Sequence, residues 1–262
     1  MLIFLVIMLF PIYFMVLISL KYEANVFIRP VQYLPIPITF ENYIRVWRDS
    51  GFVTYFVNSV VVSLSSMISV TIFSILTAYS LSRFKYRGKT LVILFLLLTQ
   101  MVPQALLLIP IFTVFHNLGL TNTLTSLVIM AVATNLAFCT VMMKGFFSTI
   151  PVELEEAAHI DGCRRLQGVI YVVLPVMLPC IVAVGAFAFV SAWNSYLLPL
   201  ILLNDPSRYT LTIGLNLLIG AYTMRYTLLA AAGVLCLIPA VAMFAYMQKY
   251  MVSGLSAGAI KG

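Results

Sequence analysis

Residues 52–82 read FVTYFVNSVVVSLSSMISVTIFSILTAYSLS and contain no Asp, Glu, Lys or Arg. A helix needs about 20 apolar residues to cross the hydrocarbon core of a bilayer, and this stretch exceeds that length. The whole chain is also apolar: 63% of its 262 residues are hydrophobic and only 9% are charged. An ordinary soluble domain is about 25% charged. The sequence therefore predicts an all-α fold class, that of a polytopic helical membrane protein.

Apolar stretches of this kind predict about six transmembrane helices, in a single transmembrane domain that covers residues 1–262. The predicted spans cover about 1–20, 55–82, 91–115, 124–143, 169–203 and 226–247. Prolines within 169–203 predict kinks or an irregular end of that span. Residues 209–223 are apolar but short, so we interpret them as a re-entrant or interfacial element, and a seven-span arrangement stays open.

The distribution of Lys and Arg predicts the orientation of the chain in the membrane. Residues 83–89 carry four cations in one short loop, and the positive-inside rule assigns such a loop to the cytoplasm. With six spans, the loop 144–168 and the C-terminus lie on the same side. The net charge of +7 fits anchoring to anionic lipid rather than nucleic-acid binding.

The chain lacks the residue patterns that catalysis or metal binding would need. His116 and His159 are far apart, and the four cysteines show no paired spacing, so no metal site is predicted. Gly88-Lys89-Thr90 resembles the end of a phosphate-binding loop, but Arg83 stands where that loop needs Gly. The predicted spans also lack the ionisable residues that proton-coupled carriers use. We expect no catalytic residue and no cofactor bound by this chain.

The loop 144–168 contains the most polar stretch of the sequence. This stretch, residues 151–162, reads Pro151-Val-Glu-Leu-Glu-Glu156-Ala157-Ala158-His-Ile-Asp161-Gly162. It holds four of the eight carboxylates of the chain. Pro151 suits the first turn of a helix, the glutamates suit its positive terminus, and Gly162 suits a stop with positive φ. The pattern predicts a short helix, a sharp turn and a second helical stretch.

One face of this predicted helix combines small and acidic residues that another protein could approach closely. The face consists of Leu154, Ala157, Ala158 and Asp161. The alternative is an amphipathic connector that lies on the bilayer, although such connectors usually carry Lys and Arg on the polar face.

At these residues the chain resembles the permease subunits of binding-protein-dependent ABC importers. Their signature is Glu-Ala-Ala, three residues, Gly, nine residues, Ile, one residue and Leu-Pro. The matching residues here are Glu156-Ala157-Ala158, Gly162, Val172 in the Ile position, and Leu174-Pro175. Other segments resemble the carbohydrate branch of the family, close to the G-type permeases of maltose systems. These segments are 78–84, 100–103, 193–196 and the tail 254–262. Ser195-Tyr196 departs from the usual Glu-Phe after Trp-Asn.

The resemblance implies a permease subunit that moves a carbohydrate or related solute across the cytoplasmic membrane of a bacterium or archaeon. It implies four kinds of partner: a second homologous permease, two ATP-binding subunits that hold ATP and Mg, an extracytoplasmic solute-binding protein, and the lipid bilayer. It assigns ATPase coupling to Glu156, Ala157, Ala158, Asp161 and Gly162. It also implies an ATPase-interface tail at Gly254, Gly258 and Lys261, for which a frayed terminus is the alternative.

Amide and aromatic side chains at or near membrane depth are candidates for the substrate pathway. They are Gln100, Gln104, Asn135, Trp193, Asn194 and Tyr196. Sugar hydroxyls need neutral donors and acceptors, and an aromatic ring could stack on a sugar face. For each residue, hydrogen bonding between helices is the alternative. A stand-alone channel or ion-coupled carrier, or a non-transporting scaffold, remains an alternative function, but both leave the loop signature unexplained.

Overall fold

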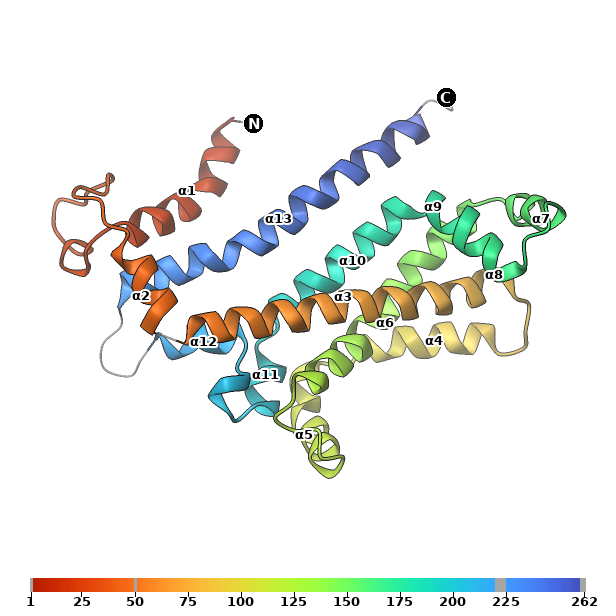
Figure 1. Ribbon diagram of the computed structural model, residues 1–262, viewed down its shortest axis with the longest axis horizontal. Helices are drawn as coiled ribbons and strands as arrows, with labels where there is room; N and C mark the ends of the chain where they lie inside the picture. The colour runs from red at the N-terminus through yellow and green to blue at the C-terminus, as the bar shows by residue number, and fades with distance from the viewer. Residues whose placement is uncertain (1, 50, 220–224, 260–262) are drawn as a thin grey trace. The chain divides into compact units, whose positions relative to one another are not determined.

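In a computed structural model of the chain, the described residues are 2–49, 51–219 and 225–259, with the backbone alone described at 2–3, 49 and 251–259 (Figure 1). The described residues form helices joined by turns and loops, without a strand among them. The predicted all-α fold class is therefore confirmed. The chain divides into two compact units, one of residues 1–60 and 203–241 and one of residues 61–202 and 242–262.

The first unit combines two stretches of the chain, residues 1–60 and 203–241. Its elements are α1 (Leu2–Ser19), a 3-10 turn (Glu23–Asn25), α2 (Glu41–Asp49), the start of α3 (Phe52–Arg83), a second 3-10 turn (Pro206–Arg208), α12 (Leu211–Leu217) and the first part of α13 (Tyr226–Ala259), as far as Val241. The Asp205 carboxylate accepts a hydrogen bond from the Ser207 backbone N–H at 2.9 Å, which lowers the pKa of Asp205. The short apolar stretch 209–223 contains the helix α12. Residues 220–223 of this stretch lie outside the described residues.

Polar side chains of α3 hold the segment that leads into α12. Asn58 Nδ2 donates to the carbonyl oxygens of Ser207 and Tyr209, both at 3.0 Å. Ser59 Oγ accepts from the Leu211 N–H at 2.7 Å, which satisfies a backbone donor at the start of α12. Serine and asparagine inside a long apolar helix therefore act here as anchors for the neighbouring element.

The second unit contains the rest of α3 and ten shorter elements. They are α4 (Lys89–Thr99), a 3-10 turn (Gln104–Leu107), α5 (Leu108–Asn117), α6 (Leu124–Thr149), α7 (Glu153–Ile160), α8 (Arg165–Gly168), a π-helical turn (Val169–Val173), α9 (Leu174–Val176), α10 (Leu178–Trp193) and α11 (Leu197–Leu202), followed by the end of α13. Side chains of α3, α6, the π-helical turn and α10 form its buried core, together with Met177 between α9 and α10. Core members include Val70, Ala78, Met143, Phe147, Met177 and Val184.

Three described helices are long and apolar enough to cross a membrane: α3, α6 and α13 up to Tyr250. Two further candidates are bent pairs, and Phe4–Ser19 of α1 is a shorter apolar helix. The six predicted apolar stretches therefore correspond to helical segments, but two of them are not single straight helices. Helix α6 also continues to Thr149 and α13 to Ala259, beyond the predicted ends at 143 and 247.

The predicted span 91–115 is broken between α4 and the 3-10 turn that precedes α5. The two parts meet at 90° across residues 100–103. Pro103 has an extended backbone, with φ −60° and ψ 122°, and has no N–H to continue the hydrogen-bond ladder. The span expected over 91–115 therefore corresponds to a bent pair of helices and not to one continuous helix.

The predicted span 169–203 is also divided. The segment Arg165–Val176 meets α10 at an angle of 81° at Met177, between Pro175 and Pro179. Helix α10 ends at Trp193, and residues 197–202 form the separate α11. Two prolines at this spacing remove two backbone donors from adjacent turns, so the helix bends where the ladder is interrupted.

Candidate functional site

Helix α7 forms in the predicted loop and has the predicted polarity. Its first turn carries Glu153, Glu155 and Glu156, which favours helix formation because carboxylates stabilise the positive helix terminus. Pro151 lies before the helix rather than in its first turn, since α7 begins at Glu153.

The predicted helix stop at Gly162 is confirmed. Gly162 has φ +90°, a conformation that residues with a Cβ rarely adopt. Its N–H donates to the carbonyl of His159 at 3.1 Å, and the Cys163 N–H donates to the carbonyl of Ala158 at 2.9 Å. These bonds close the end of α7 and turn the chain back toward α8.

Helix α8 packs against one side of α7, so the two alanines of the signature have different surroundings. Ala158 is only 6% exposed, and a Cβ placed on Gly168 of α8 would lie 3.6 Å from the Ala158 Cβ. Ala157 is exposed. Both alanines were expected on one outer face. Only Ala157 lies there, because successive helical residues point about 100° apart and α8 covers the side that carries Ala158.

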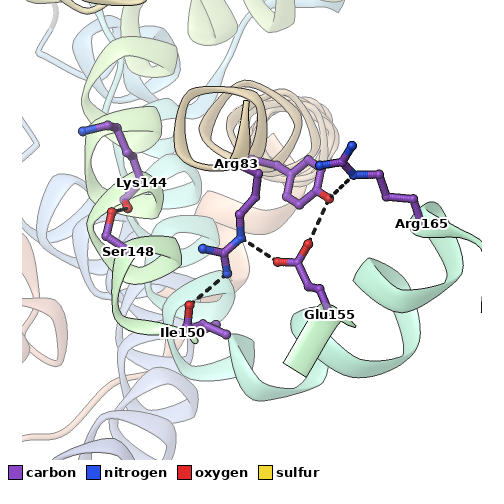
Figure 2. Close-up of polar contacts among 7 residues, drawn as sticks. Arg83, Lys144, Ser148, Ile150, Glu155 and Arg165 are labelled. Carbon is purple, nitrogen blue, oxygen red and sulfur yellow. Dashed lines mark hydrogen bonds and ion pairs between the residues drawn. The ribbon is translucent and has the colours of Figure 1, made fainter. Parts of the chain in front are cut away.

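The strongest polar contact of the site joins α7 to α3 (Figure 2). Arg83 Nε lies 2.6 Å from Glu155 Oε1, and Arg83 Nη2 donates to the carbonyl oxygen of Ile150 at 2.9 Å. The side chains of Arg83 and Glu155 are 7% and 13% exposed. Removal of one partner from a buried ion pair costs about 3–5 kcal/mol, because the other charge is left without compensation.

Tyr79 and Arg165 extend this contact to α8. Tyr79 Oη donates to Glu155 Oε2 at 3.1 Å and accepts from Arg165 Nε at 3.2 Å. The Arg165 guanidinium also lies over the ring of Phe84, 4.3 Å from its centroid. Tyr79 is one helical turn before Arg83, so both side chains leave the same face of α3.

The sequence did not identify Arg83, Tyr79 or Glu155 as members of one site. Tyr79 and Arg83 belong to the segment 78–84 that resembles the carbohydrate branch, and Arg83 is also a cation of the loop 83–89, but neither was linked to Glu155, which was one of several acids. Arg83 and Glu155 are 72 positions apart in the chain, and no local pattern pairs residues at such a separation.

The opposite side of α7 is open and mixes charged with apolar groups. Glu156, Ala157 and Asp161 are exposed, and Ile160 is 86% exposed. Beside them lies a cavity of about 430 Å³. It is lined by Val152, Glu155, Glu156, His159, Ile160, Cys163, Arg164, Arg165 and Gly168.

The residues proposed for the substrate pathway lie elsewhere in the second unit, and none of them lines this cavity. Asn135 is buried; its Nδ2 donates to the Ala131 carbonyl at 2.8 Å, and its Oδ1 accepts from Ser191 Oγ at 2.9 Å. Trp193 is buried and stacks on Phe189, with ring centroids 5.8 Å apart. Both therefore contribute to packing around α6 and α10.

The other pathway candidates are more accessible. Gln100, at the break after α4, is exposed and donates from Nε2 to the Thr134 carbonyl at 3.1 Å. Gln104 and Asn194 are exposed, and Tyr196 is half-buried. In the predicted tail, Gly254 and Gly258 belong to the last turns of α13, and Lys261 lies outside the described residues.

Possible metal ligands among the described side chains do not cluster. No group of three or more His, Cys, Asp or Glu side chains among them is arranged to hold an ion. The arrangement around α7 consists instead of one buried charge network and one open face, which suits contact with a protein.

Comparison with known proteins shows the family of the chain. Residues 70–256 match the family described as the binding-protein-dependent transport system inner membrane component. The sulfoquinovosyl glycerol transport system permease of Agrobacterium fabrum is 34% identical over 97% of this chain and 89% of that protein. The trehalose/maltose transport system permease of Thermococcus litoralis is 34% identical over 98% of this chain and 93% of that protein.

A solved structure has the same fold. A crystal structure of a bacterial ABC transporter that imports the acidic polysaccharide alginate aligns with a TM-score of 0.81 and 27% identity, over 95% of this chain and 92% of that chain. Permeases of this kind are not enzymes themselves, and the predicted multi-pass membrane protein is confirmed. The chain therefore belongs to the binding-protein-dependent transport system inner-membrane components, the permease subunits of ABC importers.

Proposed function

We propose that this permease subunit moves a carbohydrate or a related solute, and that α7 is the helix through which a separate ATPase drives it. The observation that carries the coupling role is the construction of α7. Its inner side is tied to α3 by the Arg83–Glu155 ion pair, and its outer side presents Glu156, Ala157 and Ile160. The solute class follows from the relatives, which are named for sulfoquinovosyl glycerol and for trehalose and maltose.

The proposed assembly contains a second homologous permease, two ATP-binding subunits and an extracytoplasmic solute-binding protein. ATP and Mg²⁺ belong to the ATP-binding subunits. The family's dependence on a binding protein supports the last partner.

We further propose that α7 and the C-terminus are cytoplasmic. The loop 83–89 carries four cations and begins at Arg83, the residue that pairs with Glu155 of α7. Since the positive-inside rule assigns that loop to the cytoplasm, α7 belongs on the same side.

In this mechanism the chain converts a displacement at its cytoplasmic end into a rearrangement of its spans. Closure of the ATPases would displace α7, with Gly162 as the turn that lets α7 tilt against α8. From α8 the chain runs through the π-helical turn and α9 to the bend at Met177. The two helical parts meet there at 81°, so a small rotation about this bend would change the direction of the whole of α10.

Affinity purification in mild detergent tests the proposed function. We compare the tagged wild type with Ala157→Arg, which alters an exposed position of α7 without disturbing the packing of Ala158. Arg45→Glu, at an exposed ion pair with Glu41 of α2, is the control for a change of surface charge.

The expected result is recovery of an ATPase and a second permease with the wild type and with Arg45→Glu. Ala157→Arg should lose about tenfold or more of the ATPase and keep the second permease, because a bulky cation is placed in the centre of the contact. A wild type that purifies without an ATPase in several mild detergents would sink the proposal. ATP-free transport in vesicles would then favour a stand-alone channel or carrier.

A further inference from the structure

Two neighbouring glutamates of α7 have opposite surroundings. The Glu155 side chain is 13% exposed and contacts Arg83 and Tyr79, whereas Glu156 is exposed. Adjacent helical residues point about 100° apart, so only one of the two can face α3. The two adjacent glutamates can therefore have different roles, although the sequence does not distinguish them.

Arg83 joins three elements at one point. Its Nε pairs with Glu155 of α7 at 2.6 Å, and its Nη2 donates to the carbonyl of Ile150 at 2.9 Å. Ile150 is the residue that caps the C-terminus of α6. Because the guanidinium is a planar fork with donors in fixed directions, one arginine can hold both acceptors at once, and a lysine cannot.

Tyr79 stiffens the same junction. Its ring packs on Phe147 of α6 with centroids 5.7 Å apart, and its hydroxyl bonds to both Glu155 and Arg165. The ends of α3 and α6 and both short helices α7 and α8 thus share one polar network. Hydrogen bonds in such a weakly solvated network reinforce one another.

We propose that Arg83 and Glu155 are positioning residues that pass the displacement of α7 to the long helix α3. This inference rests on the proposed coupling role of α7. Short connections flank α7 at residues 150–152 and 161–164, and both would absorb a movement of α7 if nothing else restrained it. The ion pair bypasses these connections and makes α7 and the end of α3 move together. Glu156 faces the ATPase, and Glu155 faces the membrane helices.

The test uses the assembled complex and separates assembly from transmission. The variants are Glu155→Gln, Arg83→Gln and the double variant, with Arg83→Lys as the conservative change. Glu153→Gln is the matched control, because it neutralises an exposed carboxylate in the same turn of α7 that belongs neither to the network nor to the coupling residues. Tyr79→Phe is a milder variant that removes the hydroxyl and keeps the ring on Phe147, for use if the others do not fold.

Two quantities are measured on each purified complex: the rate of ATP hydrolysis, and the change in maleimide labelling of a reporter when ATP and Mg²⁺ are added. The reporter is Asn194→Cys, at the exposed end of α10, with Cys163 and Cys236 replaced by Ser. Cys139 and Cys180 are buried and can stay. This readout needs no knowledge of the transported solute.

We expect Glu155→Gln and Arg83→Gln to bind the ATPase at the wild-type level and to hydrolyse ATP. The labelling change per ATP hydrolysed should fall about 2- to 30-fold, the range of coupling changes for residues that link two sites. The double variant should fall no further than the worse single variant, because both remove one interaction. Arg83→Lys should recover part of the change, since lysine restores the charge but not the bond to Ile150.

The inference would be overturned if the labelling change per ATP hydrolysed were the same in all network variants as in the wild type. Selective loss of the ATPase from Glu155→Gln, with retention in Glu153→Gln, would also overturn it, because Glu155 would then be the docking residue. An assembled wild type whose labelling is indifferent to ATP would leave no movement to transmit and would overturn it too. Failure of the proposed function appears differently, as a wild type that never carries an ATPase.

Discussion

Gly162 shows how one residue can set the geometry of the proposed coupling site. Its φ is +90°, and a Cβ built on it would meet no atom within 4 Å. The requirement for glycine is therefore one of backbone conformation and not of space. Gly168, six residues later, has a helical φ of −58° and only an ordinary contact with Ala158.

These two glycines form a matched pair for mutation. Gly162→Ala should cost about 1–2 kcal/mol, because an L-residue is strained at positive φ. Gly168→Ala should be neutral or stabilising by up to about 1 kcal/mol, because Ala favours a helix. Thermal unfolding of the purified protein checks this, with a fall of about 2–4 °C per kcal/mol expected for Gly162→Ala. Equal melting temperatures for the two variants would contradict the role given to the Gly162 turn.

At the scale of elements, the start of α13 depends on a residue from the other end of the chain. The Glu23 carboxylate accepts hydrogen bonds from the N–H groups of Tyr226 and Thr227, at 2.9 and 3.1 Å, and from Thr227 Oγ1 at 2.6 Å. The first N–H groups of a helix have no partner within it. A carboxylate at this position satisfies two of them and also complements the helix dipole.

Glu23→Ala should therefore destabilise the protein by about 1–2 kcal/mol, the usual cost of removing a helix cap. Glu41→Ala is the control, because Glu41 makes an exposed i,i+4 pair with Arg45 that is worth about 0.3–0.5 kcal/mol. Hydrogen exchange at the first turn of α13 is the measurement. Faster exchange there in Glu23→Ala and not in Glu41→Ala is expected. Similar exchange in both variants would show that the cap contributes nothing.

At the scale of the whole molecule, the proposed sidedness can be tested through a natural cysteine. Cys163 follows Gly162 in the turn after α7 and is partly exposed, whereas Cys139 and Cys180 are buried in the second unit. If α7 is cytoplasmic, a membrane-impermeant maleimide should label Cys163 in inside-out vesicles and not in right-side-out vesicles. The number of spans and the positive-inside rule together lead to this expectation.

The variant Cys163→Ser measures the background from the other cysteines, Cys236 above all. Labelling of Cys163 from the outer side alone would invert the orientation of every span. It would also separate α7 from any cytoplasmic ATPase.

Features that depend on the chain's local properties could be predicted from the sequence. Apolar stretches long enough to span a bilayer predict helices without knowledge of their neighbours, since the backbone must satisfy its own hydrogen bonds in lipid. The turn at Gly162 and the bends near Pro103 and Pro175 follow from the φ and N–H of single residues. The spacing from Glu156 to Pro175 indicated the family.

Contacts between distant segments were decided only by the tertiary structure. The inward position of Ala158 depends on where α8 folds back. The choice of Glu155 rather than Glu156 as the partner of Arg83 depends on which side of α7 meets α3. Asn135 is a candidate for the substrate pathway, and the tertiary structure shows that its Oδ1 accepts a hydrogen bond from Ser191, 56 residues away. In each case the side chain could serve more than one role, and the element packed against it decides which role it has. The hydropathy of the sequence does not show which element that is.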